Sequence, residues 1–314
     1  MLNSGVRWPQ GKSFAFTIVD DTDESTIENT KPVYDLLASL GFRTTKTVWP
    51  LRPHTKGNSP YGSLEDDRYR QWITDLQQAG FEIALHGVAD EPSRRDRIVA
   101  GLEGFRDVMG AYPRMHVNHV GQYENLYWYH NRLVGPPRWV YRIAERLKKK
   151  RIAISLGHDP HSAYFWGDLA KSRVEYVRNF TFAEINTLKV DPWMPYHSPM
   201  HPYVNFWYSA SQATDARRFA EIMTEEKQDQ LAAESGCCIL YTHFGFRFVD
   251  HGKIDARFIR IMKRLTSLGG YFAPASVLLD FLRTRETWKP RIAPFDLQQL
   301  QWRWLFEKWR FGSS

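Results

Sequence analysis

Three segments of this sequence pass from an amphipathic helical pattern through glycine directly into a β-rich segment. The apolar residues at helical spacing are Val33, Leu36, Leu37 and Leu40; Tyr69, Trp72, Ile73 and Leu76; and Phe258, Ile261, Met262 and Leu265. The glycines and the strand candidates that follow them are Gly41 with Phe42–Trp49, Gly80 with Phe81–Leu85, and Gly269 and Gly270 with Tyr271–Ala275. Glycine fits the left-handed residue that ends many helices. Helices that alternate with strands predict an α/β fold with a parallel sheet.

Further strand candidates lie between these segments and bring the total to seven or eight. They are Phe14–Val19, Met115–Asn118, Ile152–Leu156, Val174–Arg178 and Cys237–Tyr241. This number favours a closed or nearly closed barrel over a doubly wound sheet, and no Gly-rich phosphate-binding turn follows the first strand. We therefore predict a distorted (β/α) barrel with seven or eight parallel strands. The proline-rich segment Asn186–Ser211 is predicted to be a long loop walled by aromatic side chains.

Composition limits the partners and the compartment that we expect. The net charge of +7 would suit an anionic partner, but the charge is spread along the chain, with clusters only at Lys148–Arg151 and near the C-terminus. No nucleic-acid docking motif accompanies it, so we expect no nucleic-acid partner. Cys237 and Cys238 are neighbours that would point to opposite faces of a strand, which disfavours a disulfide. No apolar run resembles a signal peptide or a membrane span, which predicts a cytoplasmic protein.

Three carboxylates follow the first strand candidate within four residues. They are Asp20, Asp21 and Asp23, and the strand ends of such a barrel surround one common mouth. Asp also caps helices, which would explain Asp23 because a helical stretch follows it. Capping does not explain the adjacent pair, whose mutual repulsion is relieved by a cation or a shared proton. We therefore expect a metal ion and a general base at Asp20 and Asp21.

Histidines follow two later strands. His86 comes directly after Phe81–Leu85, and Asp90 follows it at a spacing that could hold one metal ion from a single loop. His243 follows Cys237–Tyr241, where it could donate a proton to a leaving group or help to hold an oxyanion.

The order of these motifs resembles the polysaccharide deacetylase family, the NodB-homology domain. The matching segments are Val-Asp-Asp-Thr-Asp at 19–23, His86 after a strand, and Leu-Tyr-Thr-His at 240–243. The family's motifs are Thr-Phe-Asp-Asp followed by Gly or Asp, His-Ser/Thr-x-x-His, and a late Leu-x-His. The resemblance implies a distorted parallel barrel, a zinc or similar divalent ion held by Asp-His-His, and hydrolysis of N- or O-acetyl groups on a sugar polymer.

Carried over residue by residue, the resemblance makes Asp20 the general base, Asp21 and His86 metal ligands, and His243 the acid. Asp90 stands where the family has its second metal histidine. The ligand set would then be Asp-His-Asp, which is harder in character, so zinc is expected first but the identity of the metal stays open.

The third motif also departs from the family, which has an Arg followed by prolines there. This chain reads Met-His-Val-Asn-His-Val-Gly at 115–121. His116 or His119 could supply the missing imidazole ligand, or Asn118 and His119 could bind substrate. Arg178, after a later strand, would suit an anionic group of the substrate or could steady Asp20. His158 is a further candidate for the mouth.

The expected function is that of a metal-dependent hydrolase, a deacetylase of an acetylated sugar in surface polysaccharide metabolism. A carbohydrate substrate would account for the aromatic loop, with Trp193 as a sugar contact. Two alternatives stay open: hydrolysis of another non-peptide carbon–nitrogen bond on the same barrel, and a non-catalytic glycan-binding or assembly role.

The C-terminal segment differs in composition from the rest of the chain. We divide the chain into a catalytic barrel at 1–285 and a Trp-rich, basic helical extension at 286–314. Leu297, Leu300, Trp304 and Leu305 form one stripe at helical spacing. This stripe predicts packing on the barrel, and the alternative is peripheral contact of the C-terminal helix with an anionic membrane surface.

Overall fold

The computed structural model of the chain describes residues 6–54, 61–147 and 154–312. Seven parallel strands follow one another around a barrel that closes because β7 pairs with β1, and an eighth strand, β10, pairs with the beginning of β1. The strands are β1 (Ala15–Asp20), β2 (Thr45–Val48), β3 (Glu82–Leu85), β4 (Met115–His116), β5 (Tyr176–Phe182), β6 (Phe206–Gln212), β7 (Cys237–Thr242) and β10 (Tyr271–Phe272), with a small separate hairpin of β8 (Val249–Asp250) and β9 (Lys253–Ile254). The predicted (β/α) barrel is confirmed.

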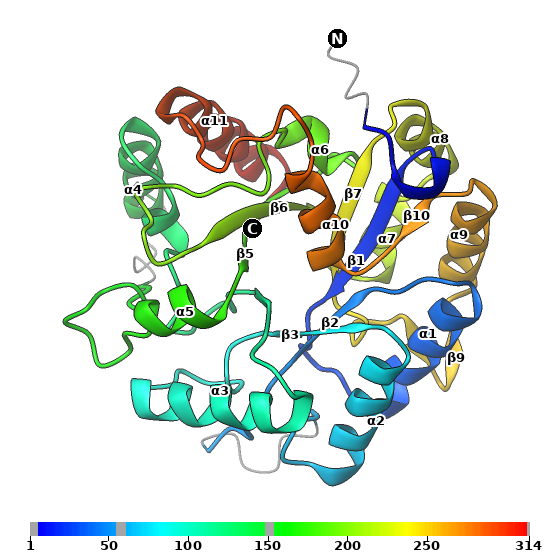
Figure 1. Ribbon diagram of the computed structural model, residues 1–314, viewed down its shortest axis with the longest axis horizontal. Coiled ribbons are helices and arrows are strands. Elements are labelled where there is room, and N and C mark those ends of the chain that lie inside the picture. The colour runs from blue at the N-terminus through cyan, green and yellow to red at the C-terminus, as the bar shows by residue number, and fades with distance from the viewer. Residues whose placement is uncertain (1–5, 55–60, 148–153, 313–314) are drawn as a thin grey trace.

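Helices surround the strands, as Figure 1 shows. They are α1 (Ile27–Ser39), α2 (Asp67–Gln78), α3 (Arg95–Met109), α4 (Pro136–Leu147), α5 (Gly167–Arg173), α6 (Thr187–Val190), α7 (Ala216–Ile222), α8 (Glu225–Ala233), α9 (Ala256–Ser267), α10 (Ala275–Arg283) and α11 (Pro294–Phe311), with short 3-10 helices η1 (Pro9–Gly11) and η2 (Tyr129–Arg132). The apolar residues form two buried clusters. One lies between strands and outer helices, and the other joins inward-facing strand residues to Leu278, Leu279 and Leu282 of α10.

The three helix–glycine–strand segments of the sequence fold as predicted. They form α1 with β2, α2 with β3, and α9 with β10. The apolar positions of α2 are all buried, and Gly41 and Gly80 have positive φ angles of 82° and 91° after their helices. The helical pattern therefore identified both the inward face and the end of each helix correctly.

Two segments differ from their predicted structure, one predicted as a loop and one as a strand. The segment 186–211 is not one long loop, because Phe206–Gln212 forms β6, in which Trp207 and Tyr208 are fully buried. Its prolines all precede this strand, so they do not interrupt its hydrogen bonds with β5. Of the predicted strand Ile152–Leu156, residues 152 and 153 lie outside the described residues, as does the basic run 148–151, and residues 154–156 form no strand.

The C-terminal helix α11 lies against α4 and β5. Leu297, Leu300 and Trp304 are buried on its inner side, and the Trp304 ring contacts the rings of Tyr141 and Phe180 at centroid distances of 6.0 and 5.1 Å. Among the described residues, no helix has both the length and the apolar character required to cross a membrane. Cys237 and Cys238 are buried free thiols, as expected of neighbours on opposite faces of β7.

Candidate functional site

The polar residues predicted at strand ends gather at the carboxyl-terminal end of the barrel. Asp20 is the last residue of β1, and His86 and His243 directly follow β3 and β7. His119 follows β4, and Arg178 lies within β5. Because all seven barrel strands are parallel, these positions share one mouth.

Asp23 lies at the centre of this cluster. Its Oδ1 atom is 2.8 Å from Nε2 of His119, and its Oδ2 atom is 3.2 Å from Nε2 of His86 and 3.1 Å from Nε2 of His243. Three imidazole rings from three different strand ends therefore converge on one carboxylate. Trp49 packs against the rings of His86 and His119, at 4.8 and 5.2 Å between centroids, and so helps to fix their orientation.

The electrostatics of the cluster follow from this convergence. Burial alone would raise the pKa of the Asp23 carboxyl, but the neighbouring His86 and the hydrogen bonds from His119 and His243 outweigh it and hold that pKa well below its usual range. Burial likewise opposes the charged form of His243, yet the carboxylates of Asp23 and Asp21 raise its pKa above the usual histidine value. The mouth thus favours the ionised form of the Asp23 carboxyl.

The same side chains suit a divalent metal ion. Asp23, His86 and His119 each offer one ligand atom, and these atoms lie within 4.8 Å of one another; Asp21, Asp23 and His243 form a second such group. Carboxylate and imidazole groups are the ligands that zinc and related metals use in proteins. His86 and His119 each have a buried Nδ1 atom that makes no hydrogen bond within the described chain. Their Nε2 atoms, which face the Asp23 carboxylate at 3.2 and 2.8 Å, are the ones positioned to act as ligands.

His243 has a supporting contact that the other two histidines lack. Its Nδ1 atom lies 2.7 Å from the carbonyl oxygen of Thr214, which favours a proton on Nδ1 and leaves Nε2 facing the mouth. Nε2 also lies 3.2 Å from the hydroxyl of Tyr241. This environment suits a residue that binds or transfers a proton at Nε2.

Asp21 is held by a buried arginine. Nη1 and Nη2 of Arg178 donate to its two oxygens at 2.9 and 2.6 Å, and the guanidinium lies 4.0 Å from the centre of the Tyr241 ring. Burial opposes the Arg178 charge, but Asp21 outweighs it and raises the Arg178 pKa. Arg178 therefore binds Asp21, not Asp20 as one reading of the sequence had it. Asp21 Oδ2 is 3.9 Å from Nε2 of His86, so the fixed carboxylate borders the cluster.

Asp20 points away from this cluster. Its carboxylate accepts hydrogen bonds from the Tyr34 hydroxyl at 3.0 Å and from the Phe244 amide at 2.7 Å, and it forms a fully buried ion pair with Lys46 at 3.0 Å. Burial disfavours the Lys46 ammonium, but Asp20 beside it raises the Lys46 pKa overall. This geometry argues against the predicted general-base role of Asp20, because its oxygens are enclosed by protein groups.

The structure places three other predicted site residues apart from the ligand groups. Asp90 is half-buried in a bent segment and belongs to neither candidate group of the described chain. Asn118 binds the backbone of Leu126 through both its amide and its carbonyl, at 2.9 Å each, so it fixes the loop after β4. Trp193 is partly buried and packs against the core.

The two remaining histidine candidates also lie outside the ligand groups. His116 is buried in β4, where burial lowers its pKa to about 3. His158 accepts a hydrogen bond from the Tyr127 amide at 3.2 Å.

The sequence did not indicate the central position of Asp23 in this cluster. The predicted capping role of Asp23 is wrong, because the N-cap of α1 is Thr26, which forms a capping box with Asn29. The Thr-x-x-Asn pattern at 26–29 was the signal that would have freed Asp23 for another role. Lys46 was also missed, because the strand candidate 42–49 mixes Arg43, Lys46 and three threonines with its apolar residues and gives no local sign that this lysine is buried.

Comparisons with known proteins agree with this architecture. No protein-family model matches the chain, and no curated protein matches its sequence. Solved structures do match. A putative polysaccharide deacetylase from Mycobacterium smegmatis is 14% identical with a TM-score of 0.53, over 92% of this chain and 96% of that one. A probable polysaccharide deacetylase from Pseudomonas aeruginosa PAO1 is 11% identical with a TM-score of 0.51, over 90% and 95%.

A third match is an allantoinase, Puue, which is 12% identical with a TM-score of 0.53 over 90% of this chain and 94% of that one. At these identities the matches establish a shared fold. The chain therefore has the NodB-like barrel fold of the polysaccharide deacetylases.

Proposed function

We propose that this protein is a divalent-metal-dependent hydrolase that removes an acetyl group from an N- or O-acetylated sugar. The observation that carries the proposal is the convergence of His86, His119 and His243 on Asp23, beside the Asp21–Arg178 pair. Together, aspartate carboxylates, imidazole rings and an arginine held in one orientation are the groups that metal-assisted acyl hydrolysis needs.

Asp23, His86 and His119 would hold the metal ion, with zinc as the first candidate. When bound, such an ion polarises an acyl carbonyl and makes a bound water more acidic. The proposed ligand set is therefore Asp-His-His, with Asp23 and His119 in the places that the sequence had given to Asp21 and Asp90. The donor types match those of hydrolytic zinc sites.

Asp21 would act as the general base. Arg178 fixes the orientation of its carboxylate, and a carboxylate that receives two hydrogen bonds still has lone pairs available for a water proton. His243 would act as the acid, because its Nδ1 atom is held by the Thr214 carbonyl and its Nε2 atom faces the mouth. The base would take a proton from the attacking water, and the acid would give one to the departing amine or alkoxide.

The fold shared with two polysaccharide deacetylases supports a carbohydrate substrate. The aromatic segment around Trp193 does not add to this support, because Trp207, Tyr196 and Tyr208 are buried in the core. The allantoinase of the same fold keeps hydrolysis of another carbon–nitrogen bond as the alternative. We keep residues 1–285 as the proposed catalytic unit and 286–314 as its extension.

Metal analysis of four purified proteins tests the proposed ligands. Wild type, Asp23→Asn, His119→Asn and the matched control Asp90→Asn are chelated, dialysed, reloaded with zinc, cobalt, nickel or manganese, and measured for bound metal. We expect near-stoichiometric metal in wild type and Asp90→Asn and little in the other two. Loss of metal only in Asp90→Asn would restore the ligand set predicted from sequence, and no metal in any protein would favour a binding role without metal chemistry.

Substrate assays follow with the metal-loaded protein. Acetate release from acetylated chito-oligosaccharides and acetylated xylan reports the proposed activity, and hydrolysis of allantoin reports the alternative. Activity on sugars that disappears in Asp21→Asn supports the proposal. Activity on allantoin alone would select the alternative, and sugar binding without turnover would select the non-catalytic role.

A further inference from the structure

Helix α4 turns an apolar stripe toward solvent. Trp139, Val140, Ile143 and Leu147 lie at the spacing of one helix face, and all four are exposed, Trp139 to 63%. The opposite side of the helix contributes Pro137 and Tyr141 to the protein interior. An outer face of this composition is unusual, because the outward side of a surface helix normally carries charged and polar residues.

Helix α11 also carries apolar residues on its outward side. Phe295, Trp302, Phe306 and Trp309 recur at intervals of three, four and seven residues and are exposed, Trp309 to 82%. The inner side of α11 is formed by a separate apolar set that includes Leu300 and Trp304. The helix therefore has apolar residues on both its protein-facing and its solvent-facing sides.

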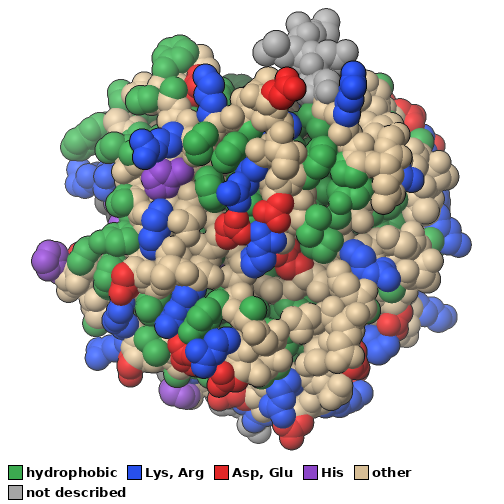
Figure 2. All heavy atoms as spheres, in the orientation of Figure 1, with side chains coloured by type: hydrophobic (Ala, Val, Ile, Leu, Met, Phe, Trp, Pro, Cys, Tyr) green, Lys and Arg blue, Asp and Glu red, His purple; other side chains and the backbone are tan. Residues whose placement is uncertain are grey.

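The two helices are neighbours. The ring of Tyr141 on α4 stacks on Trp304 of α11, and Figure 1 places the helices side by side at one edge of the barrel. Nine of the fourteen exposed large apolar side chains of the described chain lie on these two helices. Figure 2 shows hydrophobic side chains interspersed with Lys and Arg at the edge where Figure 1 places α4 and α11. We call the exposed apolar residues of α4 and α11 the aromatic face.

Positive charge accompanies the aromatic face. Arg142 and Arg146 lie on α4, and Arg303, Lys308 and Arg310 lie on α11. The Arg142 guanidinium lies 5.5 Å from the centre of the Trp139 ring, so charge and apolar surface are interleaved.

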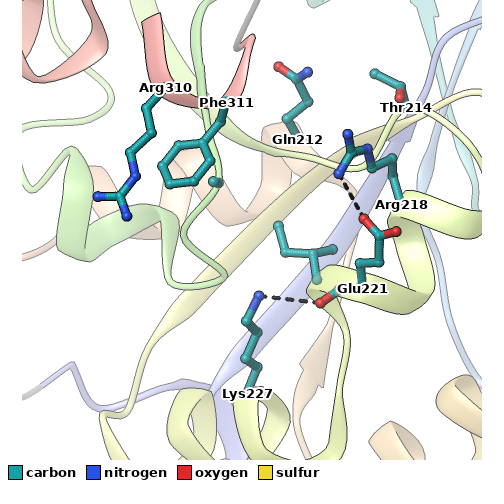
Figure 3. A pocket seen from close by; sticks show the side chains of 9 residues that line it. Gln212, Thr214, Arg218, Glu221, Lys227, Arg310 and Phe311 are labelled. Carbon is teal, nitrogen blue, oxygen red and sulfur yellow. Dashed lines mark hydrogen bonds and ion pairs between the residues drawn. The ribbon is translucent and has the colours of Figure 1, made fainter. Parts of the chain in front are cut away.

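A pocket of about 370 Å³ adjoins the carboxyl end of α11. Arg218 of α7, Lys227 of α8 and Arg310 of α11 contribute to its lining (Figure 3). Arg218 pairs with Glu221 at 2.8 Å, and the Lys227 ammonium donates to the Glu221 carbonyl at 3.3 Å. In the part of the chain that the structure describes, no ion pair joins Lys227 or Arg310 to a carboxylate. The pocket therefore presents uncompensated positive charge beside the aromatic face.

We propose that the aromatic face docks on the surface of an anionic lipid bilayer, with lipid phosphates near Lys227 and Arg310. Trp and Phe side chains favour the boundary between headgroups and acyl chains, and adjacent Lys and Arg side chains add attraction to anionic lipids. A second copy of this chain would bring the same positive charges together, so charge complementarity favours lipid over self-association. The docking extends the expected contact of the C-terminal helix to α4 and does not depend on the proposed hydrolase activity.

Vesicle flotation with the full chain tests the proposal. The vesicles contain phosphatidylcholine alone or mixed with phosphatidylglycerol. We expect binding to the mixed vesicles, weaker binding at high salt, and affinity lower by about tenfold or more in the Trp139→Ser/Trp309→Ser double variant. Lys227→Gln/Arg310→Gln should weaken binding to the mixed vesicles specifically. Val277→Ser, which alters an exposed apolar residue of α10, is the matched control and should bind like wild type.

Several results would overturn the proposal. Absence of vesicle binding, or equal binding by wild type and the Trp double variant, would show that the aromatic face does not bind a lipid bilayer. Unchanged affinity in Lys227→Gln/Arg310→Gln would remove the anionic headgroup contact. A dimer in light scattering that the Trp double variant dissociates would assign the aromatic face to a second copy of the chain. Because the changed side chains are exposed, unaltered thermal unfolding should show that each variant is folded.

Discussion

Adjacent carboxylates at the end of β1 have different surroundings. The Asp20 carboxylate is enclosed by Lys46, Tyr34 and the Phe244 amide and has no exposed surface. Asp21 and Asp23 instead border imidazoles at the mouth of the barrel. A run of four residues thus contributes one carboxylate to a buried ion pair and two carboxylates to the candidate reaction centre.

The three residues are of the same type, so the partners of each carboxylate depend on the direction in which its side chain leaves the strand end. Successive residues of a strand point to opposite sides, so neighbouring aspartates reach different partners. A motif of adjacent aspartates therefore predicts one residue on the inside of the barrel without saying which.

The largest expected effect is that of Asp23→Asn on activity. The variant removes the carboxylate on which three histidines converge, so we expect turnover to fall by about a thousandfold or more, roughly 4 kcal/mol of activation free energy. The free energy of unfolding should change far less than in Lys46 variants. Steady-state kinetics with urea unfolding measures both, and wild-type turnover in this variant would show that Asp23 is not part of the reaction centre.

Lys46→Met should have the opposite effect, with a large loss of stability and little change in turnover. It leaves the buried Asp20 carboxylate without its cation, which costs about 3–5 kcal/mol of the free energy of unfolding. The Asp20→Asn/Lys46→Met double variant should recover much of that loss because no buried charge remains. Urea unfolding reports the stability, and turnover per folded molecule should stay close to wild type. A double variant as unstable as the single one would contradict a structural role for the pair.

Asp191 differs from Asp20 because it is a buried carboxylate whose nearest partner is neutral. It accepts a hydrogen bond from Ser209 at 2.6 Å, and burial raises its pKa to about 7 from 3.8. The folded state then binds a proton more tightly than the unfolded state, so this group should lower stability as pH rises from about 4 to about 7, by roughly 3 kcal/mol.

Unfolding measured across this pH range should show a smaller decline in Asp191→Asn. The exposed control Asp250→Asn should follow wild type. Parallel wild-type and Asp191→Asn curves would show that Asp191 does not titrate in this range.

Arg178→Lys should have the smallest of these effects. Lysine keeps the charge but loses the two-pronged contact with Asp21, so the carboxylate is less well oriented and turnover should fall about a hundredfold. If Arg178 acts by positioning Asp21, the pH profile of turnover should also shift. A drop in stability with an unchanged profile would limit Arg178 to a structural role.

The helical elements were the most predictable part of the fold. In α1, α2 and α9 the apolar spacing, the terminal glycine and the following strand agree, and local signals of this kind do not depend on distant contacts. Strand β6 was not predictable in this way. Its three consecutive aromatic residues and the small residues after them follow a proline-rich stretch, and only pairing with β5 and β7 distinguishes the segment from a loop.

The sequence predicted where the candidate site lies, at the mouth of the barrel, better than it predicted which residues form the candidate ligand groups. The parallel strand ends bring Asp21, His86 and His243 together as expected. Asp90 does not join the candidate ligand groups, because the residues after His86 form bends instead of a helical turn, starting at Gly87 with a φ angle of 87°. The proximity of His119 and Asp23 depends on the paths of two separate loops, which no local pattern specifies.

Strand β1 is hydrogen-bonded along both of its edges. It pairs with β7 over six residues on one side, and with β10 and then β2 on the other. The bonds continue past its end, since the Asp21 amide donates to the Thr242 carbonyl at 2.8 Å and the Thr22 amide to the Thr47 hydroxyl at 3.0 Å. Amide protons from Phe16 to Thr22 should therefore exchange with solvent only when the whole barrel opens. The segment that carries the proposed base, Asp21, would then be among the last parts of the molecule to lose its order.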